Sequence, residues 1–467
     1  MRNTNISEIK TAFPGACAPN IADYYGKKMN TWRKVFEGHP PWEKVKFHGL
    51  KKKEDRPMNM LNTAKVLCDC FADLTFSEQV EITVDNENFQ QYITEQLNEN
   101  GFWKKIPDLL SSAYALGGGC VKVFVENKKP RIDFVYADKF IPVGWNGRGI
   151  FDGIFSAVTV RDGKYYTLLE RQSVGKAEYR LFKSGDGGSL GAETNLSELY
   201  GDLPPIVNYG GTVPMFSYFK PAVSNNAEYD VPLGMSIYAN ALDTLKALDV
   251  AFDSFSREFV LGKKRIIIPA SCVQTVPDTD TGEPVRYFDA NDEAFVALNV
   301  EDAEKFKITD NTIELRVEEH VAAINALLNI LCFQVGLSAG TLSFDAVQGV
   351  KTATEVISQD SKTQRTIKSN KNLLTEMIEG LVHGLISLGV WLEDLKPKEY
   401  SVNISWQDNV VIDDNTLIDN TIKLYSAGLL DLERAIAKAN KCDENTAAEI
   451  AKKIRANSAA GSADFFG

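Results

Sequence analysis

Residues 318–392 read EEHVAAINALLNILCFQVGLSAGTLSFDAVQGVKTATEVISQDSKTQRTIKSNKNLLTEMIEGLVHGLISLGVWL. Within residues 321–335 the apolar side chains recur at helical spacing, which predicts an amphipathic helix that ends at Gly336. A short segment, residues 337–351, interrupts this pattern before a second helix begins.

The second helix is predicted to be very long. Thr352 and Glu355 have the spacing of a capping box, and no proline follows before Pro397. Such a helix would contain about 40 residues and extend roughly 60 Å, whereas an average helix has about 11 to 12 residues. Residues 358–372 are polar on all sides apart from Ile367, so we expect this half to span solvent or to meet another subunit.

The segment between the two helices has an apolar tip flanked by glycines. Leu342, Phe344 and Val347 lie between Gly340 and Gly349, and glycine provides flexible joints on either side. The plain alternative is an ordinary helical hairpin with an exposed connection.

The same segment carries a short motif, FD followed by GxxTATEV. Its residues are Phe344, Asp345, Gly349, Thr352, Ala353, Thr354, Glu355 and Val356. This motif resembles the portal proteins of tailed double-stranded DNA bacteriophages, specifically the long-tailed, siphophage type. In that family the segment is the tunnel loop, followed by the kinked helix that crosses the ring.

Other phrases extend the resemblance over about residues 20–455. NTAKVLCDCFADLTF followed by EITV, and SSAYALGGGCVKVFV, resemble the family's wing, and LYSAGLLDLERAIAKAN with ENTAAEIAKKI resembles its crown. The resemblance implies an α+β, portal-type fold with an α+β wing, a two-helix stem, a small clip, a long cross-ring helix and a helical crown. The implied domains are wing 1–234, stem helix 235–264, clip 265–316, stem helix 317–340, tunnel loop 341–352, long wing helix 353–398 and crown 399–467.

The residues before the stem predict helices followed by short strands. Helices are expected over residues 20–37, 59–76 and 88–116, and the glycines at 117–119 are expected to cap the last of these rather than to bind phosphate. Residues 131–218 alternate short strands with turns, which predicts an antiparallel meander.

The stem prediction rests on a second apolar pattern. From Tyr238 to Phe259 apolar residues alternate spacings of three and four, which fits a helix of about 27 residues, roughly 40 Å long. A plain core helix is the alternative, but residues 321–335 could pair with it antiparallel, with a small insertion at the far end. Within this insertion Asp278 and Asp280 have only part of a calcium-loop pattern, so a polar hairpin turn is the better interpretation.

Composition limits the classes of function. The 467 residues predict about two to four structural units. A net charge of -12 argues against a surface built to grip nucleic acid, although it suits a tunnel that must not hold phosphates tightly. The apolar run 380–392 is too short to span a bilayer and the N-terminus has no signal core, so we expect a cytosolic origin and no membrane partner.

Candidate chemistry is sparse, so we expect no enzyme, cofactor or metal site. The seven cysteines have no metal-ligand spacing and are expected to be reduced. His320 is expected to be a solvated residue of a first helical turn, and His383 a residue of helix packing. P-loop, Rossmann, GxSxG and HExxH motifs are missing. An uncatalogued hydrolase is a remote alternative, and a monomeric scaffold that binds another protein is the main non-enzyme one.

The resemblance implies a dodecameric ring at one capsid vertex, through which DNA is packaged and ejected. Its implied partners are the terminase large subunit, a head-completion adaptor, capsid and scaffolding proteins, and double-stranded DNA bound weakly. An oligomeric capsid-assembly or scaffold protein without a DNA channel is the alternative. The expected site residues are Leu342, Phe344, Asp345, Val347, Gly349 and Lys351 in the tunnel loop; Leu245, Leu248, Phe252, Phe255, Phe259, Ile324, Leu328 and Leu331 in stem packing; and Thr279, Asp280, Gly282 and Glu283 in the clip.

Overall fold

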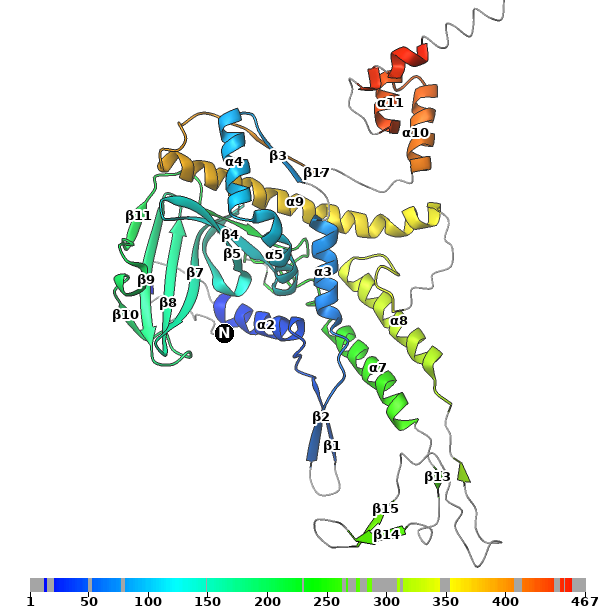
Figure 1. Ribbon diagram of the computed structural model, residues 1–467. Coiled ribbons are helices and arrows are strands. Elements are labelled where there is room, and N and C mark those ends of the chain that lie inside the picture. Colours follow the sequence, from blue (N-terminus) through cyan, green and yellow to red (C-terminus); the bar gives the residue numbers. More distant parts are fainter. Residues whose placement is uncertain are drawn as a thin grey trace, which may run out of the picture. The chain divides into compact units, whose positions relative to one another are not determined.

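The computed structural model divides the chain into two compact units (Figure 1). Unit 1 contains residues 1–77 and 83–403, and unit 2 contains residues 78–82 and 404–467. The structure describes residues 12–14, 21–48, 53–76, 80–147, 149–228, 231–262, 266–267, 274–277, 284–287, 309–310, 314–344, 353–406, 414–440, 446–448 and 450–455.

Helices and antiparallel strands are mixed in unit 1, as the α+β prediction requires. One sheet has the order β10-β9-β8-β7-β6, with β11 also paired to β9, and a second has the order β12-β4-β5. The strands of the larger sheet are β6 (Phe140–Asn146), β7 (Gly149–Arg161), β8 (Lys164–Ser173), β9 (Lys176–Ser184), β10 (Ala192–Thr194) and β11 (Ile206–Asn208). Those of the smaller are β4 (Gly119–Glu126), β5 (Lys129–Tyr136) and β12 (Phe216–Phe219). The predicted antiparallel meander is therefore confirmed.

Side chains from both faces of the larger sheet are buried. Ile154 and Leu169 pack with Phe13, a residue far earlier in the chain, on one face. On the other face, Phe155 packs with Phe140 of β6 and Phe216 of β12, their ring centroids 5.1 to 5.6 Å apart. The aromatic cluster joins the two sheets, because Phe216 belongs to the smaller one.

The described residues between 21 and 116 form four helices of unit 1. They are α2 (Ile21–Phe36), α3 (Thr63–Phe76), α4 (Glu87–Glu99) and α5 (Phe102–Leu116). The expectation of a single helix over residues 88–116 is wrong, because Gly101 adopts a left-handed conformation (φ 63°) and separates α4 from α5. Gly117 (φ 85°) ends α5 and donates its N–H to the carbonyl of Ala113, which confirms the predicted glycine cap.

A β-hairpin that the sequence pattern did not predict precedes α3. Its strands are β1 (Lys44–His48) and β2 (Lys53–Pro57), paired antiparallel. Four of the five residues of β2 are charged, so this strand lacks the apolar alternation by which strands are recognised, and β1 has only Val45 and Phe47 at alternate positions.

Helices α7 (Leu242–Leu261) and α8 (Val317–Val335) pack on each other (Figure 1). The first is shorter than the 27 residues expected, because Tyr238 lies in a turn before it. The neighbouring Ile237 donates its N–H to the carbonyl of Tyr114, and the Tyr238 hydroxyl donates to the carbonyl of Trp32 at 2.8 Å. These long-range bonds hold the turn outside the helix. The end of α8 at Gly336 (φ 87°) confirms the prediction.

Short strand pairs occur in the insertion between α7 and α8. β13 (Ile266–Ile267) pairs with β16 (Thr309–Asp310), so the two ends of the insertion lie together. β14 (Gln274–Pro277) pairs with β15 (Pro284–Tyr287), and the expected site residues Thr279, Asp280, Gly282 and Glu283 lie between them, outside the described residues.

The longest described helix is α9 (Ala353–Trp391), 39 residues, which confirms the predicted long helix. It packs on the smaller sheet and on α3 and α4 (Figure 1). A Cβ at Gly380 would lie 2.5 Å from the Ser217 hydroxyl of β12, and one at Gly384 would lie 3.2 Å from Val123 of β4, so these glycines permit the close approach.

The polar half of α9 is not excluded from the chain's own interior, because Thr363, Ile367 and Asn370 form a buried stripe. The prediction failed there because the stripe is polar and hydrogen-bonded, with Asn370 accepting from the N–H of Ala222 at 3.0 Å. By length and composition Ser361–Trp391 could cross a membrane. Its apolar side chains, however, are those of a core helix, with residues such as Met377 and Leu385 fully buried.

Unit 2 is small and mainly helical. Strand β17 (Val402–Trp406) pairs with β3 (Val80–Val84), and α10 (Asp414–Ser426) and α11 (Leu432–Asn440) follow. The Asp431 carboxylate accepts from the N–H of Arg434 at 2.7 Å, which is the predicted cap of α11. Ile436 packs with Ala447 and Ala451 of a further helical segment.

Candidate functional site

The last turn of α7 and the first turn of α8 are joined by an ion pair. Glu258 of α7 accepts from Arg316 at 3.0 Å (Nε) and 2.9 Å (Nη2), a bidentate contact. The hydrogen bonds from Arg316 lower the pKa of Glu258 to about 2, so the carboxylate is charged at any physiological pH. Because Glu258 precedes the insertion and Arg316 is its last residue, the pair closes the insertion at its base.

An aromatic cluster lies beside this ion pair. The ring of Phe255 lies 5.7 Å from that of His320, 5.2 Å from that of Phe259 and 6.3 Å from that of Phe344. His320 Nε2 is also 3.7 Å from the Glu258 carboxylate. The expectation that His320 is simply solvated is therefore wrong, because its ring lies between an aromatic side chain and a carboxylate.

Burial of the expected packing residues changes along the helix pair. Leu245 and Leu248 of α7 are buried, Phe252 and Phe255 are half-buried, and Phe259 is 46% exposed. Buried residues of α8 are Ile324, Leu328 and Leu331. Leu245 lines a small cavity together with Val35 of α2 and Ala64 of α3, and α7 packs on α3. The hydrophobic contacts of the pair therefore weaken toward the insertion.

The segment that leaves α8 is fixed to α9 by polar contacts. Thr366 donates its hydroxyl to the carbonyl of Gly336 at 2.7 Å, and the Thr363 hydroxyl accepts from the N–H of Ser338 at 2.9 Å. Of the expected loop residues, Leu342 is half-buried and Phe344 is 39% exposed. Asp345, Val347, Gly349 and Lys351 lie outside the described residues.

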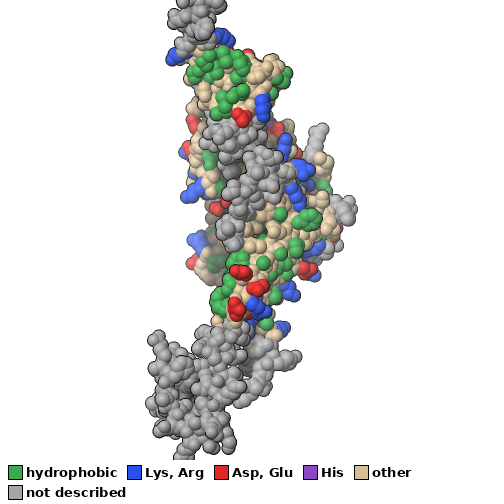
Figure 2. Space-filling view, turned by 90° about the vertical axis from the view of Figure 1, so that its right-hand side faces the viewer, with side chains coloured by type: hydrophobic (Ala, Val, Ile, Leu, Met, Phe, Trp, Pro, Cys, Tyr) green, Lys and Arg blue, Asp and Glu red, His purple; other side chains and the backbone are tan. Residues whose placement is uncertain are grey.

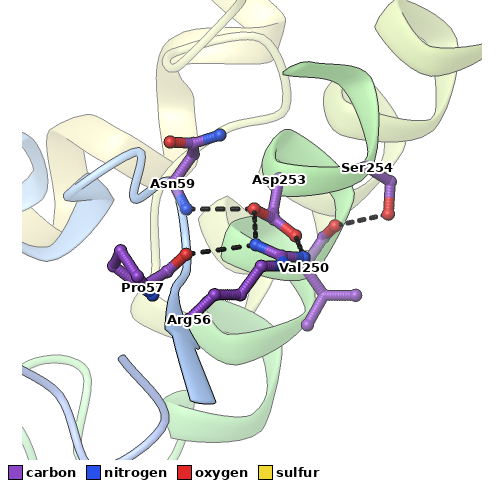
Figure 3. A network of polar contacts seen from close by, with 6 residues as sticks. All are labelled: Arg56, Pro57, Asn59, Val250, Asp253 and Ser254. Carbon is purple, nitrogen blue, oxygen red and sulfur yellow. Dashed lines mark hydrogen bonds and ion pairs between the residues drawn. The ribbon is translucent and has the colours of Figure 1, made fainter. Parts of the chain in front are cut away.

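Two carboxylates of α7 hold the base of the β1–β2 hairpin, and Figure 3 shows one of them, Asp253, with its partners. Asp253 accepts from both terminal nitrogens of Arg56, at 2.9 and 2.6 Å, and from the N–H of Asn59 at 3.1 Å. Asp249, one turn earlier, accepts from the Trp42 indole at 2.9 Å and from the N–H of Leu61 at 3.0 Å. This clamp was not predicted, although two carboxylates spaced i, i+4 in an apolar helix were a visible signal.

The two carboxylates have opposite pKa shifts. The hydrogen bonds from Arg56 lower the pKa of Asp253, whereas burial raises the pKa of Asp249, whose carboxylate accepts from two neutral donors, the Trp42 indole and the N–H of Leu61. Asp253 is therefore the residue whose charge stabilises the clamp.

A second buried ion pair lies in a cavity of about 470 Å3 between β5 and β7. Lys122 donates to Glu170 at 2.5 Å and lies 3.7 Å from Asp133, and its ammonium stands 5.1 Å from the centroid of the Phe155 ring. Burial opposes the charge of Lys122, but the two carboxylates raise its pKa on balance. The pair is satisfied internally, which is the arrangement of a structural ion pair rather than of an acid–base couple.

Within the described residues, no group of three or more His, Cys, Asp or Glu side chains could hold a metal ion. The features that stand out there are a clamped helix pair and an insertion closed at its base. A family model described as "Phage portal protein, SPP1 Gp6-like" matches residues 20–460. The chain therefore belongs to the SPP1 Gp6-like family of phage portal proteins.

No curated protein matches the chain. Membership of the family makes the protein a phage portal protein and a component of the virion capsid. Within the capsid, portal proteins of this family form a homo-oligomeric ring that works with a packaging motor. The family is structural rather than catalytic.

Proposed function

We propose that this chain forms a dodecameric ring at one capsid vertex, through which double-stranded DNA enters during packaging and leaves on ejection. The observation that carries the proposal is the loop between α8 and α9, whose first residues are anchored while Phe344 is only partly buried. In this assignment residues 341–352 are the tunnel loop, α7 and α8 form the stem, and residues 265–316 form the clip.

The outer face of α8 supports a ring of neighbouring subunits. Ile330 and Phe333 lie one turn apart and are 48% and 74% exposed. A helix that is apolar on both its inner and its outer face is expected to be buried on both. Figure 2 views the side of the molecule on which α8 lies, and it shows hydrophobic side chains at the surface there, with acidic and basic ones nearby. A second copy of the chain is the occupant we propose.

The channel would hold DNA only weakly. The chain has a net charge of -12, and carboxylates on a tunnel wall reduce adsorption of phosphate. Lys351 is proposed as a weak phosphate contact of the tunnel loop.

The clip is proposed to dock the terminase large subunit and later a head-completion adaptor. The outer domains are proposed to contact capsid and scaffolding proteins. The terminase would supply the ATP-driven motor.

Deletion of residues 345–348 tests the tunnel loop. Neighbouring loop tips are proposed to pack around the axis, so the deletion should leave a soluble ring that is still incorporated into proheads but reduce the DNA packaged or retained. Phe344 and its contacts with the helix pair remain in this variant. Melting temperature, ring yield and packaged DNA are measured on the same preparation.

Replacement of the same four residues by a Gly-Ser-Gly-Ser segment is the matched control, because it restores length without side-chain chemistry. A large loss of melting temperature and ring yield, with no selective packaging defect, would show that the segment is an ordinary structural anchor. That result would remove the tunnel-loop assignment.

A further inference from the structure

After α8 ends, the chain folds back along the same helix. Asn329 accepts from the N–H of Gly340 at 2.9 Å, and Asn325 accepts from the N–H of Phe344 at 2.8 Å. The two asparagines are four residues apart and therefore lie on one face of α8, one turn from each other. The backbone of residues 340–344, which we call the entering arm, thus runs toward the start of α8.

The entering arm is also held at its top. Gly336 and Ser338 are bonded to Thr366 and Thr363 of α9, and the Thr341 hydroxyl donates to the carbonyl of Ser338 at 2.8 Å. These contacts determine where the arm starts. They do not determine its direction beyond Thr341, where the contacts with α8 take over.

The bond at Asn325 places Phe344 against the helix pair. The Phe344 ring meets that of Phe255 at 86°, an edge-to-face contact with 6.3 Å between centroids. Phe344 is nevertheless 39% exposed, so its own burial is a weak anchor. The position of Phe344 therefore depends on polar contacts of the arm with α8, namely the two side-chain amides beneath it and the hydrogen bond from the backbone of Leu342 to the Cys332 sulfur.

The chemistry of the two asparagines suits an attachment that can be released. Asn329 is exposed and Asn325 half-buried, whereas the core face of α8 is formed by other residues, such as Ile324 and Leu328. Each amide is neutral, and water can replace it as the partner of a backbone N–H. The arm can therefore leave α8 without exposing the core side chains of this helix and without leaving a buried charge unpaired.

We infer that Asn325 and Asn329 are positioning residues of the tunnel loop, which hold its entering arm on α8 and place Phe344 against Phe255. This inference rests on the tunnel-loop role proposed above. It goes further in assigning the resting position of the arm to two side chains outside the loop.

The test compares full-length rings of three variants. The double variant Asn325→Ala/Asn329→Ala removes both acceptors, whereas Asn325→Asp/Asn329→Asp keeps an acceptor oxygen at each position. Gln334→Ala changes an exposed residue of the same helix and serves as the control. Hydrogen exchange of residues 337–344 is measured by mass spectrometry, together with ring yield and DNA packaged per prohead.

The alanine variant should exchange about fivefold faster at each released amide, since a typical hydrogen bond contributes about that factor. It should also change the amount of DNA packaged while ring yield stays normal. The aspartate variant and Gln334→Ala should behave like the unmodified protein. Unchanged exchange in the alanine variant would overturn the inference.

Faster exchange with unchanged packaging would also overturn the positioning role, provided that deletion of residues 345–348 does reduce packaging. If that deletion has no effect either, the failure lies in the tunnel-loop function, and the exchange data still decide whether the asparagines hold the arm. The two proposals can therefore fail separately.

Discussion

Replacing Asp253 by Asn should loosen the β1–β2 hairpin from α7. Asp253 is 5% exposed and accepts three hydrogen bonds, two of them from Arg56 (Figure 3). Asparagine keeps one acceptor oxygen and loses the charge. Breaking a fully buried ion pair costs about 3–5 kcal/mol, and breaking an exposed one costs about 0–1 kcal/mol. The Arg56 side chain is 27% exposed, which places this pair between the two cases. We expect a loss of about 2 kcal/mol.

Hydrogen exchange in residues 53–57 is the suitable assay, because the effect is local and global unfolding of so large a chain need not be two-state. A loss of about 2 kcal/mol corresponds to roughly 30-fold faster exchange through local opening, since about 1.4 kcal/mol is tenfold. Asp243→Asn is the control, because it removes the same charge from an exposed position in the first turn of α7. Equal exchange in the two variants would refute the clamp.

The same pair of proteins gives a pH test with a defined sign. Arg56 lowers the pKa of Asp253 in the folded state, so its stabilising contribution is complete above the unfolded value of about 3.9. The difference in local stability between the unmodified protein and Asp253→Asn should be constant from pH 8 to about pH 5. It should decrease as the pH falls below about 4 and through the folded-state pKa. A difference that is independent of pH down to acid unfolding would contradict the assigned charge.

Three further predictions address the stem, the insertion and α5. Phe252→Asp places a charge at a half-buried position of α7 and should reduce ring formation in native mass spectrometry; normal assembly would count against a stem role. Substitutions within Thr279–Glu283 should spare the ring but weaken docking of the motor or adaptor in pull-down assays, and loss of the ring itself would refute the clip assignment. Gly117→Ala should lower stability by at least about 1–2 kcal/mol in thermal melts, because φ is 85° and a Cβ would lie 2.5 Å from the Gly234 carbonyl oxygen; an unchanged melting temperature would contradict this.

Local signals in the sequence were sufficient for the long helices. The absence of proline across residues 353–391 and the left-handed glycine at the end of α8 both act within one or two turns, and both are visible without the fold. The strands β7 to β9 were likewise marked by apolar side chains and by the turn at Asp162 and Gly163, both with positive φ.

What the sequence could not reveal depends on contacts between distant residues. Strand β2 of the β1–β2 hairpin is almost entirely charged, and the hairpin's partners Asp249 and Asp253 lie about 200 residues further along the chain. The buried stripe of α9 could not be recognised from the sequence either. Thr363 and Asn370 looked solvent-exposed by composition, but they bond to Ser338 and Ala222. The fold of the entering arm depends on Asn325 and Asn329, two amides with no motif to mark them.

Electron microscopy of the purified full-length protein tests the central claim most directly. The account predicts a closed ring of twelve copies with an axial hole, with α7 and α8 of each copy packed against those of its neighbours. Monomers, or a compact oligomer without an axial opening, would contradict it.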